Sequence, residues 1–173
     1  MIVAVAFAAS GCGSSSKPET NPTTQWTNNL CMSATTWEDS ITAAADSAKS
    51  GGFSQSTLRK ASNDIQTATK KLVRDVRKLG RPPTKSGAQE EQAINDLSGK
   101  INDGVQQIQD ATKNASGATG VLNAVSTVTT TIATIGDEIK ATYKQLQRID
   151  VSGELKTAFQ KAPACKSFTK TTG

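Results

Sequence analysis

The feature that most constrains the fold of this chain is an apolar rhythm with a period of seven residues. Apolar side chains recur at alternating steps of three and four residues in four long segments, about 24–49, 56–79, 86–115 and 119–149. Residues at this spacing share one face of an α-helix, so each segment predicts an amphipathic helix. A short fifth helix is predicted over 152–161.

These helices would bury their apolar faces against one another. The side chains expected in the core are Trp26, Leu30, Trp37, Ile41, Ala44, Ala48, Leu58, Ala61, Ile65, Ala68, Leu72, Val76, Leu79, Ile94, Leu97, Ile101, Val105, Ile108, Ala111, Val121, Val125, Val128, Ile132, Ile135, Ile139, Leu146, Ile149, Leu155 and Phe159. Helices joined by loops of roughly 4–8 residues pack antiparallel. The sequence therefore predicts an all-α fold: an up-down-up-down four-helix bundle with a short C-terminal fifth helix.

One stretch of the fourth segment, residues 126–134, also suits a β-strand by composition. It reads STVTTTIAT and is rich in β-branched residues. A half-buried strand requires strict alternation, whereas Val125, Val128, Ile132 and Ile135 follow helical steps. The period therefore favours a helix.

Composition agrees with a helical bundle and narrows the chemistry. Aromatic residues make up only 4% of the 173 residues, and there is no histidine, which removes the commonest general base and zinc ligand. No Gly-rich phosphate loop and no activated nucleophile is present. The net charge of +5 with few aromatic side chains does not indicate nucleic-acid binding. We expect no enzymatic activity and no cofactor.

The N-terminus has the pattern of an export signal. Residues 1–10 are almost wholly apolar, too short to span a bilayer but long enough for the apolar part of a signal peptide. The sequence Ala9-Ser10-Gly11-Cys12 follows and resembles the lipobox of bacterial lipoproteins. This resemblance implies lipid attachment at Cys12. A non-lipidated export signal and a buried apolar segment are the alternatives, and the lack of a basic residue before the apolar run suggests that the natural start lies upstream.

The domain organisation follows from this interpretation. Residues 1–11 are the remnant of a signal peptide, with the lipobox at 9–12. Residues 12–23, which are rich in Ser, Thr and Pro, are the lipidated cysteine and a flexible tether. The helical domain is expected over 24–166 and a disordered tail over 167–173.

Two cysteines remain if Cys12 carries a lipid. Cys31 and Cys165 then form an even pair in an oxidising compartment, and we predict one disulfide between them. A reactive thiol at Cys31 is the alternative, although it has neither a CxxC partner nor a histidine to activate it.

The order of these features resembles a known group of proteins. The lipobox, the polar tether, the sequence Trp26, Cys31 and Trp37, the Gly80–Pro83 element and Cys165 near the end resemble small secreted lipoproteins of actinobacteria. The resemblance implies a helical fold. It implies no catalytic residues.

The densest charge cluster lies in the second half of the second helix and the loop that follows. It consists of Lys70, Lys71, Arg74, Arg77, Lys78, Arg81 and Lys85. We expect these residues at the tethered end of the bundle, where they could contact anionic lipid head groups. The alternative is an ordinary solvated surface near a helix C-terminus.

Two further patterns favour structural roles. Asp96, Asp103 and Asp110 recur every seven residues, about 10 Å apart along a helix, too far to share one calcium ion. Trp26 and Trp37 have the spacing of core residues, although exposed rings could stack on a ligand.

Taken together, these patterns predict a lipoprotein anchored on the extracytoplasmic face of the bacterial cell membrane. We expect a non-enzymatic interaction or scaffolding module with an unknown envelope partner. The alternative is a carrier of a small apolar ligand or lipid, with a pocket inside the bundle. A carrier would show a void near Ile101 and Val128, whereas an interaction module would show a packed core and an exposed apolar patch.

Overall fold

The computed structural model describes residues 21–52 and 54–166. The expected export signal, Cys12, most of the expected tether and the expected C-terminal tail lie outside the described residues.

The described chain is helical throughout and contains no strand. Its elements are α1 (Pro22–Ser50), α2 (Gln55–Leu79), α3 (Gly87–Lys113), α4 (Gly117–Ile149), α5 (Glu154–Lys161) and a 3-10 turn, η1 (Pro163–Cys165). The predicted all-α class with a short fifth helix is confirmed. The segment 126–134 lies inside α4, so the helical period outweighs its β-branched composition there.

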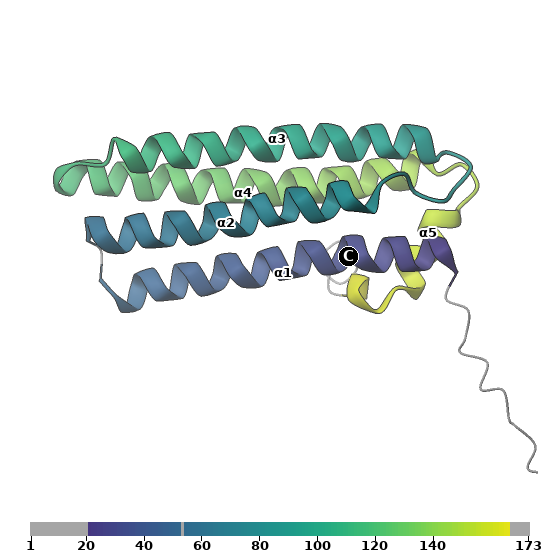
Figure 1. Cartoon of the computed structure of the whole chain (residues 1–173), viewed down its shortest axis with the longest axis horizontal. Coiled ribbons are helices and arrows are strands. Elements are labelled where there is room, and N and C mark those ends of the chain that lie inside the picture. Colours follow the sequence, from purple (N-terminus) through teal and green to yellow (C-terminus); the bar gives the residue numbers. More distant parts are fainter. Residues whose placement is uncertain (1–20, 53, 167–173) are drawn as a thin grey trace, which may run out of the picture.

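The four long helices lie side by side as a bundle (Figure 1). The start of α1, the connection from α2 to α3, and α5 share one end, which we call the α5 end; the α1–α2 and α3–α4 connections share the opposite end. Extensive packing joins α1 to α2, α2 to α3 and α3 to α4, but α1 and α4 hardly touch directly. Helix α5 and η1 pack mainly on α1.

Three helices begin two residues away from the predicted position. Helix α4 begins at Gly117 and not at residue 119, and side chains cap the other two starts. Helix α1 begins at Pro22 and not at residue 24, since the Asn21 side chain accepts hydrogen bonds from the Thr23 and Thr24 N–H groups. Pro22 and Thr23 therefore belong to the bundle and not to the tether. Helix α5 begins two residues later than expected, and the Asp150 carboxylate accepts its first N–H groups.

The predicted apolar faces form the core. Both tryptophans are buried, which confirms their packing role, and each indole N–H has a partner. The Trp37 Nε1 group donates to Thr69 Oγ1 over 3.0 Å, and that of Trp26 donates to the Gly80 carbonyl over 3.2 Å. Two core-sized aromatic side chains therefore pack without leaving a buried donor unsatisfied.

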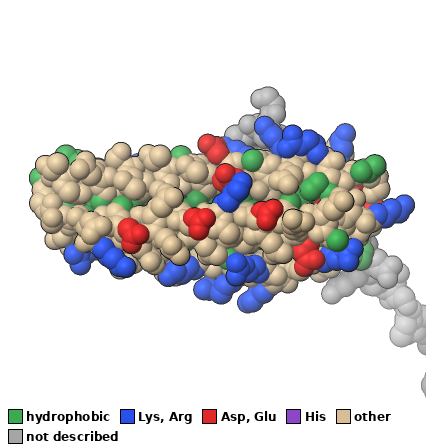
Figure 2. Space-filling view, turned by 90° about the horizontal axis from the view of Figure 1, so that it is seen from above, with side chains coloured by type: hydrophobic (Ala, Val, Ile, Leu, Met, Phe, Trp, Pro, Cys, Tyr) green, Lys and Arg blue, Asp and Glu red, His purple; other side chains and the backbone are tan. Residues whose placement is uncertain are grey.

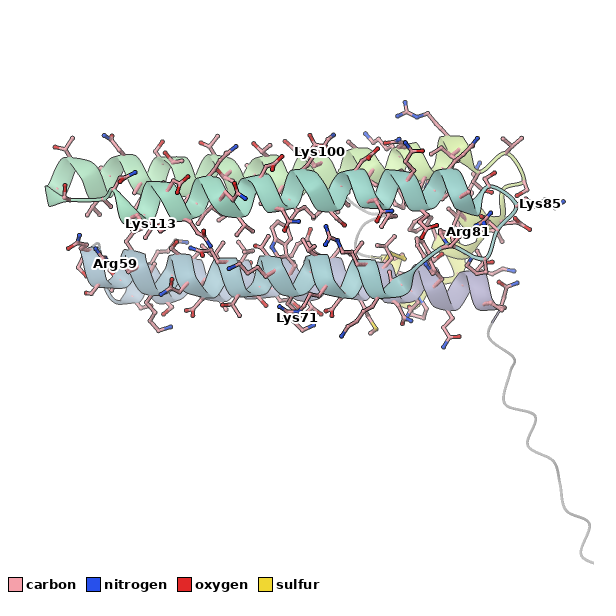
Figure 3. All side chains as sticks on the ribbon, turned by 45° about the horizontal axis from the view of Figure 1, so that its top comes forward. Arg59, Lys71, Arg81, Lys85, Lys100 and Lys113 are labelled. Carbon is pink, nitrogen blue, oxygen red and sulfur yellow. A yellow bond between two sulfur atoms is a disulfide. The ribbon has the colours of Figure 1, made fainter. Side chains whose placement is uncertain are left out.

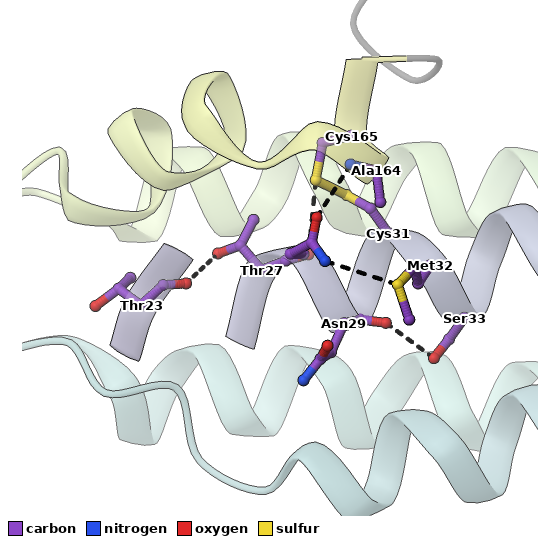
Figure 4. Close-up of a disulfide and its surroundings, with 9 residues drawn as sticks. Thr23, Thr27, Asn29, Cys31, Met32, Ser33, Ala164 and Cys165 are labelled. Atoms are coloured by element: carbon purple, nitrogen blue, oxygen red, sulfur yellow. Dashed lines mark hydrogen bonds between the residues drawn. A yellow bond between two sulfur atoms is a disulfide. The ribbon is translucent and has the colours of Figure 1, made fainter. Parts of the chain in front are cut away.

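The predicted disulfide is present. Cys31 in α1 and Cys165 in η1 are bonded across 134 residues of sequence (Figure 4). Both are buried, and the neighbouring Ala164 N–H donates to Asn28 Oδ1 over 3.0 Å. The bond fixes the C-terminal segment against α1 near the α5 end.

Candidate functional site

An apolar pocket lies between α1, α2 and α4, toward the end opposite α5. It has a volume of about 270 Å³ and is partly open to solvent. Its apolar lining consists of Ala45 and Ala48 on α1, Leu58, Ala61 and Ile65 on α2, and Val121, Val125, Val128 and Ile132 on α4. Of these, Ala48, Val125 and Ile132 were expected in the core but are only partly buried.

The pocket arises from the sizes of the residues that face each other across it. On the α1 side the wall is made of two alanines, Ala45 and Ala48, which cannot reach across to Val125 and Val128. Because α1 and α4 hardly touch, a gap remains between them. Apolar side chains of α2 form the bottom of this gap.

At the α5 end, the same space between α1 and α4 is filled. Phe159 of α5 is buried and packs edge-on against Tyr143 of α4, with ring centroids 4.5 Å apart and planes at 75°. Leu155 and Phe159 are 0% and 2% exposed. The pocket is thus the part of the α1–α4 gap that α5 does not cover.

Four polar residues also line the pocket: Lys49, Ser54 and Thr57 at its rim, where α1 ends and α2 begins, and Thr129 on α4. Lys49 lies in the last turn of α1, and its ammonium group is 3.6 Å from the Asp46 carboxylate in a solvent-exposed pair. Ser54 and Thr57 form the capped start of α2, where Ser54 Oγ accepts from the Thr57 N–H over 3.2 Å. The floor and walls carry no ionisable side chain.

A second, smaller cavity lies nearer the α5 end, beside Ile101. It has a volume of only about 40 Å³ and is lined by apolar side chains such as Leu72, Ile94 and Phe159. Ile101 itself is 1% exposed. This region is close-packed core, so the larger void is the one near Val128.

The large apolar side chains that the described residues expose do not gather on one element. They are Met32 on α1, Leu122 on α4 and Val151 in the turn before α5. Scattered exposed side chains of this kind are ordinary on soluble proteins.

The basic cluster is exposed at every predicted position. All seven residues from Lys70 to Lys85 are exposed, and Lys71 forms an ion pair with Asp75. Figure 3 shows Arg81 and Lys85 at the α5 end but Lys71 near the middle of α2. The cluster therefore extends from the middle of α2 into the α2–α3 connection at the α5 end, because nine residues of helix span about 14 Å.

Acidic side chains follow a different line. Asp96, Asp103 and Asp110 are all exposed on α3. Figure 2, which looks onto α3 from above, shows acidic side chains spaced along the middle of this face and basic side chains along its edges. No group of three or more Cys, Asp or Glu residues that could hold a metal ion occurs in the described part of the chain.

One acidic residue is buried, which its sequence pattern did not indicate. Glu90 at the start of α3 is 0% exposed. Thr84 Oγ1 donates to its Oε2, and its Oε1 has no hydrogen-bond partner among the described residues. Burial raises the pKa of Glu90 above 4.5, with a further increase from Asp150 and Glu154, while the Thr84 hydrogen bond lowers it. Glu90 lies in the first turn of α3, a position where the helix dipole favours an acidic side chain.

By length and composition, α4 is the one described helix that could cross a membrane. In the structure 22% of its most apolar window is buried: Val128 and Ile135 lie in the core, whereas Leu122 is exposed. The chain matches no known family model, and comparisons with curated proteins and with solved structures find no similar protein.

Proposed function

We propose that this protein is a non-enzymatic lipoprotein of the extracytoplasmic membrane face that binds an apolar ligand in the pocket between α1, α2 and α4. The observation that supports this function is the pocket itself. It combines a mostly apolar lining, a volume of about 270 Å³ and a few polar groups. Mostly apolar concavities with a few polar groups are typical of small-molecule sites.

The size of the pocket is sufficient for part of a lipid chain. An engineered apolar cavity of about 150 Å³ binds benzene, and this pocket is larger. Burial of apolar surface stabilises such a complex by about 25 cal/mol per Å². The alternative, an interaction module with a packed core and an exposed apolar patch, has less support because the exposed apolar side chains are scattered.

The membrane location rests on the sequence. The lipobox ending at Cys12 and the resemblance to actinobacterial lipoproteins support a lipid anchor before α1. We infer an up-down-up-down topology, which the short connections and the packing of consecutive helices support. In this arrangement the anchor leaves from the α5 end, and the pocket faces away from it.

The exposed basic cluster supports a second contact with the membrane. Its members closest to the α5 end, Arg77, Lys78, Arg81 and Lys85, form no ion pair with an acidic side chain among the described residues. We propose that they contact anionic lipid head groups beside the anchor. Each cation near such a surface contributes about 1 kcal/mol, and a second signal stabilises single-site lipid anchoring.

Ligand binding can be tested by filling the pocket. The full chain carrying Cys12→Ser would be stripped of bound lipid and titrated with the neutral apolar dye phenylnaphthylamine, whose fluorescence rises in apolar surroundings. Ala48→Phe places a large ring in the pocket, whereas Ala43→Phe places the same ring on an exposed position of the same helix.

We expect saturable dye binding by the parent protein and by Ala43→Phe, with binding at least about tenfold weaker for Ala48→Phe, equivalent to about 1.4 kcal/mol. Far-UV circular dichroism would show that both variants fold. Equal dye binding by the two variants, or no binding by the parent protein, would refute the proposed site.

A further inference from the structure

We propose that the ligand is an anionic amphiphile with a single hydrocarbon chain, such as a fatty acid, and that Lys49 binds its head group. This inference rests on the proposed function and assigns a chemical class to the ligand. Two features of the pocket support this assignment: the positive charge at its rim and the apolar residues that line the gap behind the rim.

The rim carries one full positive charge. Lys49 is the only ionisable side chain that lines the pocket, and its side chain is 72% exposed, so a ligand head group can reach it. Its pair with Asp46 spans 3.6 Å between two exposed groups. Such surface pairs contribute little stability, so the ammonium group can exchange Asp46 for a ligand carboxylate.

The helix ends at the rim add smaller charges. Ser54 and Thr57 place the N-terminal end of α2 at the pocket, and this end carries about half a positive charge that favours an anion. The C-terminal end of α1 carries the opposite partial charge. The two partial charges oppose each other, so the full charge of Lys49 makes the electrostatic potential at the rim positive. The rim therefore favours an anionic head group over a neutral or cationic one.

Behind the rim, the lining residues continue along the gap between α1 and α4, which favours an elongated hydrocarbon chain. The pocket lies along the gap between α1 and α4, and Ile132 lines it on the side toward α5. Farther along the same helix, Ile139 lines the small cavity near Ile101. The gap ends where Phe159 fills it, so the hydrocarbon chain runs along the bundle axis from Lys49 toward α5.

The test compares ligands that differ only in the head group. Decanoate, decanol and decylamine would each compete with phenylnaphthylamine for the delipidated full chain carrying Cys12→Ser, at neutral pH. The variant Lys49→Gln removes the charge at the rim. The matched control is Lys60→Gln, which removes an exposed lysine of α2 that pairs with Asp64 over 2.7 Å and lies outside the pocket.

We expect decanoate to compete about fivefold better than decanol, the range of a solvent-exposed ion pair, and decylamine to compete worst. Lys49→Gln should abolish the preference for decanoate and leave decanol unchanged, whereas Lys60→Gln should keep the preference.

Equal competition by decanoate and decanol, or a preference that survives Lys49→Gln, would overturn the head-group assignment while the apolar site remains. Absence of dye binding by the parent protein would instead overturn the proposed function itself.

Discussion

Removal of the Cys31–Cys165 disulfide should lower the free energy of unfolding more than any other small change in this chain. The two cysteines are 134 residues apart, so the bond closes nearly the whole helical domain into one loop. The chain-entropy model gives about 5 kcal/mol for a loop of this length, because the open unfolded chain gains many conformations. Typical domains have a total stability of about 5–15 kcal/mol, so the reduced protein should be marginal.

Guanidinium denaturation followed by far-UV circular dichroism measures this loss. The oxidised chain, the chain reduced before unfolding, and the double variant Cys31→Ala with Cys165→Ala would be compared. Reduction keeps both sulfur atoms in the core, whereas the double variant removes them, so the reduced chain isolates the cross-link from the packing.

We expect the free energy of unfolding to fall by a similar amount in the reduced chain and in the double variant, near the chain-entropy value of about 5 kcal/mol. A loss below about 1 kcal/mol, the contribution of one ordinary hydrogen bond, would refute the loop-entropy reasoning. It would mean that the unfolded chain stays compact without the bond, or that the packing of Leu155 and Phe159 already holds the C-terminal segment against α1.

Two further predictions concern charge. Glu90 has a raised pKa in the folded protein, so its carboxyl group retains its proton when the unfolded chain has lost it; stability therefore falls as the pH rises above 4.5 through the raised pKa. Glu90→Gln should raise the free energy of unfolding at neutral pH by about 1 kcal/mol and flatten this pH dependence in urea titrations, and a less stable variant at neutral pH would contradict the prediction. Replacement of Arg77 and Arg81 by Gln should weaken sedimentation with vesicles that contain anionic lipid by about 1 kcal/mol per charge, with no change on neutral vesicles. Equal binding of the parent protein to both kinds of vesicle would argue against the membrane contact.

The helices and most of the core could be predicted from the amino-acid pattern alone. Residues such as Ile94, Leu97 and Ile101 repeat at steps that bring one face of a helix against its neighbours, and this pattern depends only on local geometry. The period also decided between helix and strand over residues 126–134. The disulfide was predicted because Cys31 and Cys165 are the two cysteines that remain when Cys12 is assigned to lipid attachment.

Where the bundle is closed and where it is open depends on how the helices pack together, which the amino-acid pattern did not reveal. Small residues such as Ala45 and Ala48 occur both where two helices approach closely and where a gap lies between them. Their spacing in the sequence is the same in both cases, so it could not predict the pocket. The distance between α1 and α4 depends on the whole bundle and on Phe159, which fills the gap at one end.

The burial of Glu90 was equally invisible in the sequence. An acid in the first turn of a helix is normally solvated, and the local pattern fits that expectation. Here the α2–α3 connection brings Thr84 onto the carboxyl group, and the turn after α4 places Asp150 near it. Local periodicity reports which face of a helix is apolar, but contacts between segments far apart in the chain decide which polar groups lose their water.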